Sequence, residues 1–329
     1  MIKLKRIFIL SFCVLLIILS FATLSCYTAY FNMGPNTKNI VLIIPKGSGV
    51  ERISQILFSN QIIDKPKIFR ILARIVDRKL PLQAGEFSFP KSASMSDIFK
   101  ILKSGKQVIR KLMIAEGTNN LEAITIINSE PGLVGIAIAP DLEGQLFPDT
   151  YHFNFGDSRE DLVKRMKRLM QKKSLELWRE RSSDLPFKNL NEVITLASIV
   201  EKETSIDSER GRIASVFLNR LKLNMRLQSD PTVIFGITLG KRKLERPLTR
   251  KDLKQESPFN TYRINGLPPS PIANPGLASI TAVLNPDKTK DLYFVADGTG
   301  GHAFSQSLAE HNKNVGKWRK LKSLMGLPQ

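Results

Sequence analysis

Two glutamates on either side of a lysine, Glu201 and Glu203, lie at the end of a stretch with a helical pattern. Asn189 followed by Glu192 has the spacing of a capping box, in which each side chain bonds a free backbone amide at a helix start. The sequence therefore predicts a helix that begins at this pair and runs toward Thr204. Both glutamates then fall in its last turn.

The two glutamates are expected to face different surroundings. At 100° per residue, Glu203 falls within about 60° of an apolar run, and Glu201 falls about 200° away from Glu203. The apolar run consists of Leu196, Ile199 and Val200. Ionisation in an apolar setting costs solvation, so the pKa of Glu203 is expected to rise toward neutrality. A glutamate that keeps its proton near neutral pH can act as a general acid.

A structural alternative for Glu203 is an ion pair with an arginine beyond the helix end, such as Arg210 or Arg212. The helix pattern by itself does not decide between a general acid and an ion-pair partner.

Other chemistry finds little support in the residue types. Both cysteines, Cys13 and Cys26, lie near the N-terminus, which excludes a disulfide scaffold or Cys-ligated zinc in the rest of the chain. The three histidines are far apart in sequence and form no His-Glu-x-x-His pattern. Neither a metal nor a cofactor is predicted.

The N-terminal segment predicts the compartment. Residues 7–31 read IFILSFCVLLIILSFATLSCYTAYF and carry no charge. At helical rise they span roughly 37 Å, enough to cross the ~30 Å core of a bilayer. Lys3, Lys5 and Arg6 precede them, so the positive-inside rule keeps residues 1–6 in the cytoplasm. We expect a single-pass protein of the inner (cytoplasmic) membrane with its globular part on the periplasmic side; a cleaved signal peptide is the alternative.

The charge balance points to an anionic partner. The 329 residues include 49 Lys and Arg against 30 Asp and Glu, a formal net charge of +19. A location outside the cytoplasm makes nucleic acid an unsuitable partner. A helical stretch at 158–181 concentrates positive charge, which predicts either a solvated face or a surface for anionic lipid or an acidic polymer. Its cations are Lys164, Arg165, Lys167, Arg168, Lys172 and Lys173.

The rest of the chain predicts an α+β protein in two parts. A strand at 40–44, helices near 50–57 and 68–76 and a strand at 85–89 form a small module within residues 38–107. It resembles the LysM-like subdomain of cell-wall proteins, where such modules bind glycan; a packing or spacer role fits equally well. Residues 108–329 alternate helices with Pro- and Gly-rich loops, which predicts a larger, mixed α/β catalytic domain.

A series of short blocks carries a family resemblance. The blocks are Leu142–Tyr151, Leu196–Thr204, Ala214–Leu221, Leu227–Val233, Asn260–Tyr262, Gly266–Pro269, Asn274–Gly276, Phe294–Gly298, Gly300–His302 and Glu310–Asn312. In this order they resemble the endolytic murein transglycosylases, the YceG-like family. The resemblance covers residues 40–320, with the membrane anchor where the family carries it.

The resemblance implies a lyase that cuts the glycan strands of peptidoglycan internally. The β-1,4 bond from N-acetylmuramic acid to N-acetylglucosamine breaks without water and leaves a 1,6-anhydromuramic end. The second glutamate of the Glu-Lys-Glu triplet, Glu203, is implied as the catalytic residue, and the helical wheel selects the same side chain. One glutamate suffices because the nucleophile is the muramic 6-hydroxyl of the substrate itself. The resemblance also implies that the enzyme acts beside peptidoglycan synthases and terminates the strands that they elongate.

Other polar residues of the blocks are candidates for substrate contact. Hydrogen bonds to sugars are expected from Gln228, Asp230, Asn260, Tyr262 and Asn312. Glu143 and Asp149 could stabilise the positive charge of an oxocarbenium-like transition state. Turn formation is the alternative for Asp149 and Asp230, and His302 is either a cleft residue or a turn residue.

Two non-enzymatic functions remain as alternatives. The module at 38–107 and the basic surface also suit a non-catalytic peptidoglycan-binding scaffold. The cations at 164–173 also suit a protein that acts on anionic lipids.

Overall fold

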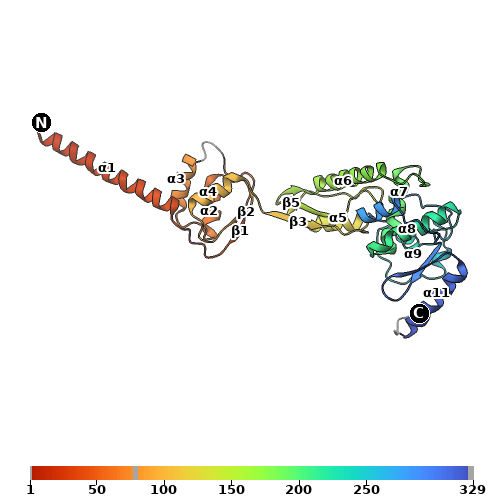
Figure 1. Cartoon of the computed structure of the whole chain (residues 1–329). Coiled ribbons are helices and arrows are strands. Elements are labelled where there is room, and N and C mark those ends of the chain that lie inside the picture. Colours follow the sequence, from red (N-terminus) through yellow and green to blue (C-terminus); the bar gives the residue numbers. More distant parts are fainter. Residues whose placement is uncertain (1, 77–80, 325–329) are drawn as a thin grey trace. The chain divides into compact units, whose positions relative to one another are not determined.

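The computed structural model describes residues 2–76 and 81–324, and the chain divides into two compact units. Unit 1 comprises Met1–Arg110 and His152–Asp157, and unit 2 comprises Lys111–Tyr151 and Ser158–Gln329. The fold mixes helices with small sheets (Figure 1), in agreement with the predicted α+β class. Within the described residues the strands pair two by two, so helices supply most of the hydrophobic core.

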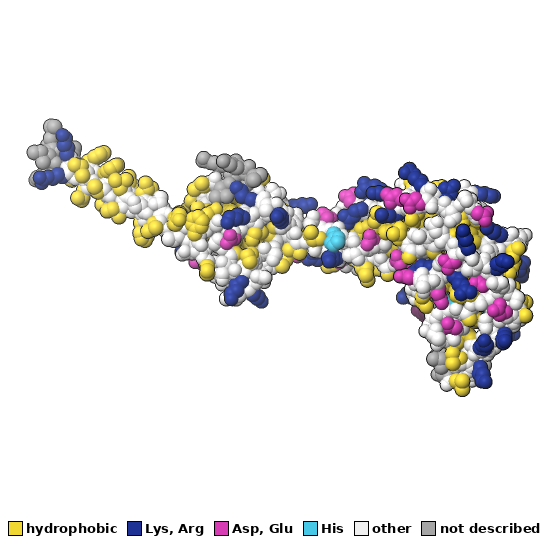
Figure 2. Space-filling view, in the orientation of Figure 1, with side chains coloured by type: hydrophobic (Ala, Val, Ile, Leu, Met, Phe, Trp, Pro, Cys, Tyr) yellow, Lys and Arg dark blue, Asp and Glu magenta, His cyan; other side chains and the backbone are white. Residues whose placement is uncertain are grey.

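The first helix, α1 (Ile2–Phe31), is long and apolar enough to cross a membrane. Its apolar side chains, such as Ile9, Leu15 and Phe21, are exposed, and Figure 2 shows hydrophobic side chains along most of the helix after its basic N-terminal end. A helix that is apolar on all sides needs an apolar medium around it. The uncharged segment predicted to span the membrane, residues 7–31, falls within α1.

The elements of unit 1 follow the predicted order. They are β1 (Ile40–Ile44), α2 (Val50–Ser59), α3 (Pro66–Val76), β2 (Gly85–Phe89) and α4 (Met95–Ser104). β1 and β2 are antiparallel, with Ile40 opposite Phe89. Phe69 and Phe99 are buried and stack with ring centroids 4.6 Å apart. This unit therefore has a hydrophobic core of its own.

Two further strands lie where the division between the units runs. β3 (Ile109–Met113) pairs with β5 (Thr150–Asn154). β5 contains the end of the Leu142–Tyr151 block.

Unit 2 is mainly helical. Its longer elements are α5 (Asn120–Ser129), α6 (Arg159–Arg179), α7 (Leu190–Glu203), α8 (Asp207–Lys222), α9 (Asp230–Thr238), α10 (Leu277–Leu284) and α11 (Leu308–Leu324). Short elements complete it: β4 (Leu133–Val134), η1 (Asp252–Lys254), β7 (Tyr293–Ala296) and β8 (His302–Ser305), while β6 (Asp157–Ser158) begins on the last residue assigned to unit 1.

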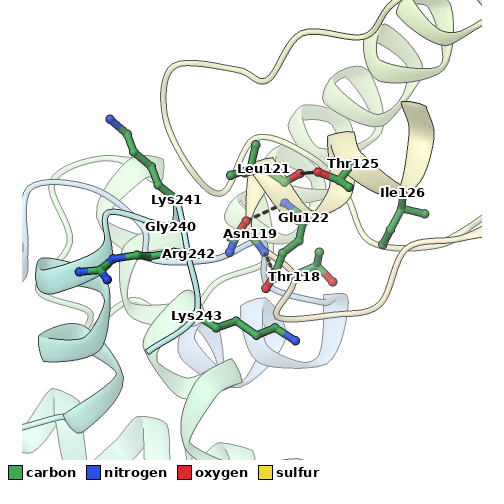
Figure 3. A pocket seen from close by; sticks show the side chains of 10 residues that line it. All are labelled: Thr118, Asn119, Leu121, Glu122, Thr125, Ile126, Gly240, Lys241, Arg242 and Lys243. Carbon is green, nitrogen blue, oxygen red and sulfur yellow. Dashed lines mark hydrogen bonds between the residues drawn. The ribbon is translucent and has the colours of Figure 1, made fainter. Parts of the chain in front are cut away.

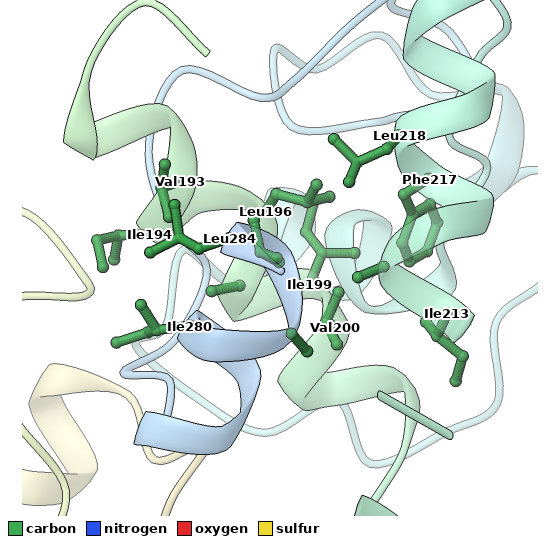
Figure 4. Close-up of a cluster of buried hydrophobic side chains, with 14 of the residues drawn as sticks. Val193, Ile194, Leu196, Ile199, Val200, Ile213, Phe217, Leu218, Ile280 and Leu284 are labelled. Atoms are coloured by element: carbon green, nitrogen blue, oxygen red, sulfur yellow. The ribbon is translucent and has the colours of Figure 1, made fainter. Parts of the chain in front are cut away.

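The central helix of unit 2 is α7, which packs against α8 and α10. Its middle turns are buried on all sides, and Figure 4 shows Leu196, Ile199 and Val200 inside the cluster. The helix begins as predicted, because the Asn189 side chain accepts a hydrogen bond from the Glu192 amide at 3.1 Å. A capping box would also have the Glu192 carboxylate accept from the Asn189 amide, but here it accepts from the amide of Lys188 instead.

Candidate active site

Glu203 is the last residue of α7, where the helix ends and the chain becomes extended at Thr204. Its side chain is half-buried. Oε1 accepts a hydrogen bond of 2.5 Å from the hydroxyl of Ser229, the residue before α9. The buried helix α7 thus delivers one carboxyl group to the start of α9, while part of that residue still reaches solvent.

Burial is the main influence on the Glu203 carboxyl group. Desolvation raises its pKa from 4.5 to about 7, and the negative charge of Asp230 acts in the same direction. The Ser229 hydroxyl, His302 and Arg220 oppose this rise without cancelling it. Near neutral pH the group can therefore hold a proton or release it, as acid–base catalysis requires.

The hydroxyl that meets Glu203 is itself held by a buried network. Ser229, Thr232 and Thr261 are almost fully buried. The Ser229 amide donates to Thr261 Oγ1 at 3.0 Å, and the Thr232 hydroxyl donates to the Ser229 carbonyl at 2.6 Å. Gln228, just before Ser229, has a left-handed backbone with φ of 53°. A non-glycine residue in this region stores strain, which commonly marks a functional site.

Asp230 and Tyr262 form a second pair beside the carboxyl group. The Tyr262 hydroxyl donates to Asp230 Oδ1 at 2.7 Å. Burial, followed by the hydrogen bond to Asp230, raises the pKa of Tyr262 above its ordinary value. The phenol therefore stays protonated and serves as a donor. The structure brings both predicted residues to the surroundings of Glu203, with Asp230 itself exposed.

A buried arginine supplies positive charge on the α8 side. Arg220 donates to the carbonyls of Leu292 and Leu227, at 2.6 and 2.7 Å. Its guanidinium lies over the Tyr293 ring, 5.1 Å from the centroid. The ring of His311 stacks on Tyr293 at 5.1 Å, and burial lowers the pKa of His311, with Arg220 adding to the effect. His311 is therefore neutral at neutral pH.

His302 is fixed by a carboxylate. Its Nδ1 lies 2.7 Å from Glu209 Oε2, and its backbone amide donates to Glu209 Oε1 at 2.9 Å. Its ring meets Phe294 edge to face at 5.3 Å. His302 contributes to the electrostatics of Glu203, so the structure places it near the candidate acid rather than in an isolated turn.

Glu201 lies on a different face of the same helix end. Oε2 accepts from the Ser279 hydroxyl at 2.7 Å and from the Gly276 amide at 3.0 Å, and Oε1 lies 3.8 Å from Arg210. The arginine that the sequence offered to Glu203 therefore belongs to Glu201. Arg212, the other arginine considered, pairs with Asp291 at 2.6 Å. The ion-pair alternative for Glu203 is wrong.

Three other predicted contact residues have different settings. Gln228 is exposed. Asn260 is almost fully buried, and its amide group donates to the carbonyls of Leu253 and Gln255, at 3.2 and 2.7 Å, so it holds the loop before Tyr262. Asn312 is exposed on α11.

Glu143 and Asp149 lie on the Leu142–Tyr151 segment. Glu143 Oε2 accepts from the Asn120 amide at 2.7 Å, at the start of α5, and burial raises the pKa of Glu143 to about 7. Asp149 is exposed and its carboxylate accepts from the amide of Thr150 at 2.7 Å, which is a local turn contact. Neither residue contributes to the electrostatics described for Glu203.

Sequence reasoning missed Ser229, which hydrogen-bonds Glu203, and Arg220, whose charge acts on it. Both residues lie inside the family blocks, at Leu227–Val233 and Ala214–Leu221, and Ser229 stands between the predicted residues Gln228 and Asp230. In residues 2–76 and 81–324, no group of three or more His, Cys, Asp or Glu is arranged to hold a metal.

Comparisons with known proteins agree on one family. The model of the YceG-like family matches residues 42–317. The chain is 36% identical over 308 residues to an endolytic murein transglycosylase of Bacillus subtilis (strain 168), covering 84% of this chain and 83% of the relative. It is 30% identical over 361 residues to an endolytic murein transglycosylase of Streptococcus pneumoniae (strain ATCC BAA-255 / R6), covering 94% of this chain and 65% of that longer relative.

A solved structure supports the same assignment. The crystal structure of a YceG-like protein from Listeria monocytogenes matches with a TM-score of 0.51 and 32% identity. The match covers 84% of this chain and 99% of that one.

Proposed function

We propose that this chain, which belongs to the YceG-like family, is an endolytic murein transglycosylase. Its substrate is the glycan strand of peptidoglycan. The observation that carries the proposal is the half-buried Glu203, whose pKa burial raises to about 7. A carboxyl group in that state can donate its proton first and accept one afterwards.

The reaction needs only this carboxyl group and the sugar. Protonated Glu203 gives its proton to the oxygen between N-acetylmuramic acid and N-acetylglucosamine, and the bond from that oxygen to the muramic anomeric carbon breaks. The muramic 6-hydroxyl oxygen then bonds to the anomeric carbon, and its proton passes to the Glu203 carboxylate. The enzyme returns to its starting state, and the product carries a 1,6-anhydro ring. No water enters.

The neighbours of Glu203 have supporting roles in this scheme. Ser229 orients the carboxyl group through its hydrogen bond. Asp230, exposed and negative, is suited to stabilise the oxocarbenium-like charge, and its bond to Tyr262 sets its direction. Gln228, His302 and Asn312 are candidates for contact with the sugar or its N-acetyl groups. Glu143 and Asp149 are candidates for more distant parts of the strand, and Asn260 supports the loop that carries Tyr262.

The location and the first module belong to the same proposal. α1 anchors the chain in the cytoplasmic membrane, with residues 1–6 inside and the active unit outside. Residues 38–107 form a LysM-like module that binds glycan, and residues 108–329 carry the catalysis. Peptidoglycan synthases are the partners that would supply newly made strands.

Product analysis tests the activity. Full-length protein in detergent is incubated with uncross-linked glycan strands, and the new ends are weighed by mass spectrometry. We expect anhydromuramic ends from the wild type and none above background from Glu203→Gln. Ends that carry an added water would instead identify a hydrolase and defeat the lyase proposal. Equal product from both proteins would remove Glu203 from the mechanism.

A further inference from the structure

Two neighbouring cavities in unit 2 form one trough beside the candidate site. They measure about 510 and 450 Å³ and share Asn119, Glu122, Gly240, Arg242 and Lys243, which define the trough. The mechanism proposed above uses none of these five residues. Figure 3 shows the 241–243 segment opposite the start of α5, with Lys243 extending toward α5 and Lys241 and Arg242 pointing away from it.

The trough begins next to the candidate acid. Lys202 and Pro231 line its second cavity, and each is the immediate neighbour of a site residue, Glu203 and Asp230 respectively. The Lys202 ammonium donates to the carbonyl of Gly117 at 3.3 Å, which fixes it across this end of the trough. A group attached to the sugar at Glu203 would therefore need to extend only a short way to enter.

The charge of the trough is positive. Lys202, Lys241, Arg242 and Lys243 line it, and the last three are exposed and form no salt bridge with any described residue. The one carboxylate in the lining, Glu122, is already used, because it accepts from the Asn119 amide at 3.2 Å in the capping box of α5. The free cations are suited to recognise carboxylate groups.

Apolar walls accompany these cations. Ile234, Phe235 and Ile272 line the second cavity, and Leu121 and Ile126 line the first. Phe235 is held in place by edge-to-face contact with Phe259, at 4.8 Å. A ligand that fits this lining has both small apolar groups and carboxylates, whereas the stripped glycan chain offers hydroxyl and N-acetyl groups and only the short lactyl carboxylate of each muramic acid.

From this lining we propose that the trough binds the acidic peptide that is attached to muramic acid. The inference rests on the function proposed above, since it concerns the same substrate. The alanine methyl groups of such a peptide meet the apolar wall, and its free carboxylates meet Arg242, Lys243 and Lys241. The enzyme then prefers strands that carry uncross-linked peptides to strands without them.

The test compares two substrates. Full-length protein in neutral detergent receives either peptide-bearing, uncross-linked glycan strands or the same strands stripped of peptide by an amidase. The wild type should have a higher kcat/KM on peptide-bearing strands. In Arg242→Gln/Lys243→Gln, the ratio of the two kcat/KM values should fall about tenfold, as expected for the loss of two charge-assisted contacts.

A matched control removes two cations elsewhere. Lys288 and Lys290 are exposed and form no salt bridge with a described residue, and Lys288→Gln/Lys290→Gln should keep the wild-type ratio. Added salt should lower the ratio in the wild type and leave it nearly constant in Arg242→Gln/Lys243→Gln, because screening acts only on the charged contacts.

Three outcomes would overturn the inference. The first is an equal kcat/KM of the wild type on both substrates. The second is an unchanged ratio in Arg242→Gln/Lys243→Gln. The third is a loss that occurs only with anionic vesicles and not in neutral detergent, which would assign these cations to lipid headgroups. A failure of the function itself is distinguishable, since the wild type would then cleave neither substrate to anhydro ends.

Discussion

The last turn of α7 presents two carboxyl groups, that of the buried Glu201 side chain and that of the half-buried Glu203, to two different surroundings. On the α10 side, Glu201 meets a hydroxyl, a backbone amide and the guanidinium of Arg210. On the α9 side, Glu203 meets one hydroxyl, and the nearby Asp230 charge opposes its ionisation. Burial is common to both. What makes one of them a candidate acid is the lack of a direct cationic partner, because an uncompensated charge is the costly state in a low dielectric.

The largest expected effect separates the two glutamates by rate. Glu203→Gln should lower kcat by about 10²–10⁴, since it removes the proton donor. Glu201→Gln should keep the pH profile of the wild type, because its amide oxygen can still accept from Ser279 and Gly276. Initial rates on uncross-linked strands measure both. A loss in Glu201→Gln as deep as that in Glu203→Gln would contradict the assignment.

For stability the order should be reversed, with the larger loss expected when Glu201 is changed. Glu201→Ala leaves the guanidinium of the buried Arg210 without its buried partner, at a cost of about 3 kcal/mol in the free energy of unfolding. Denaturant unfolding of the full chain measures the change. Asp207, the exposed partner of Arg210, is the matched control: Asp207→Ala should cost below about 1 kcal/mol. Equal costs for the two variants would show that burial of the pair is unimportant.

The raised pKa of Glu203 makes its burial unfavourable at high pH. The folded state holds the proton up to pH of about 7, whereas the unfolded chain releases it near 4.5, so stability falls as pH rises between these values. Glu203→Gln removes that loss, so its free energy of unfolding at pH 8 should exceed that of the wild type by about 1–3 kcal/mol. At pH 4 the two proteins should have nearly the same free energy of unfolding. Thermal unfolding at both pH values decides, and a destabilised Glu203→Gln at pH 8 would contradict the burial argument.

The smallest effect concerns Ser229. In the wild type, the rate should decline above pH of about 7 as Glu203 loses its proton. The Ser229 hydroxyl lowers the pKa of Glu203, so Ser229→Ala should move this decline upward by about half a pH unit to one unit. The pH dependence of kcat/KM measures it. Ser229→Thr, which keeps the hydroxyl, should restore the wild-type profile, and a downward movement in Ser229→Ala would refute the role.

Local pattern predicted part of this arrangement. The helical wheel separates Glu203 from Glu201 because both lie on one regular helix, and the cap at Asn189 fixes where that helix starts. The wheel could not show that the second face is also buried, since the covering residues are Ser279 in α10 and Gly276 just before that helix. Periodicity within one helix carries no information on which segment covers it.

Contacts between distant segments account for the rest of the site. Ser229 and Glu203 are separated by 26 residues, and His302 and Glu209 by 93. Such pairs depend on the path of loops, and the strained backbone at Gln228 has no signature in residue type. Sequence blocks indicated which loops matter, but not which side chain in each loop faces Glu203.

The division of the chain has a practical consequence for dissecting the protein. His152–Asp157 belongs to unit 1, although the chain on either side of it belongs to unit 2. A truncation at residue 108 would carry this segment away from the unit in which it packs, and would expose surfaces that are covered in the intact chain. A water-soluble derivative is better made by removing α1 only up to residue 28, which keeps the buried Ala29 and Tyr30, the latter packed on the core of unit 1, and leaves both units whole.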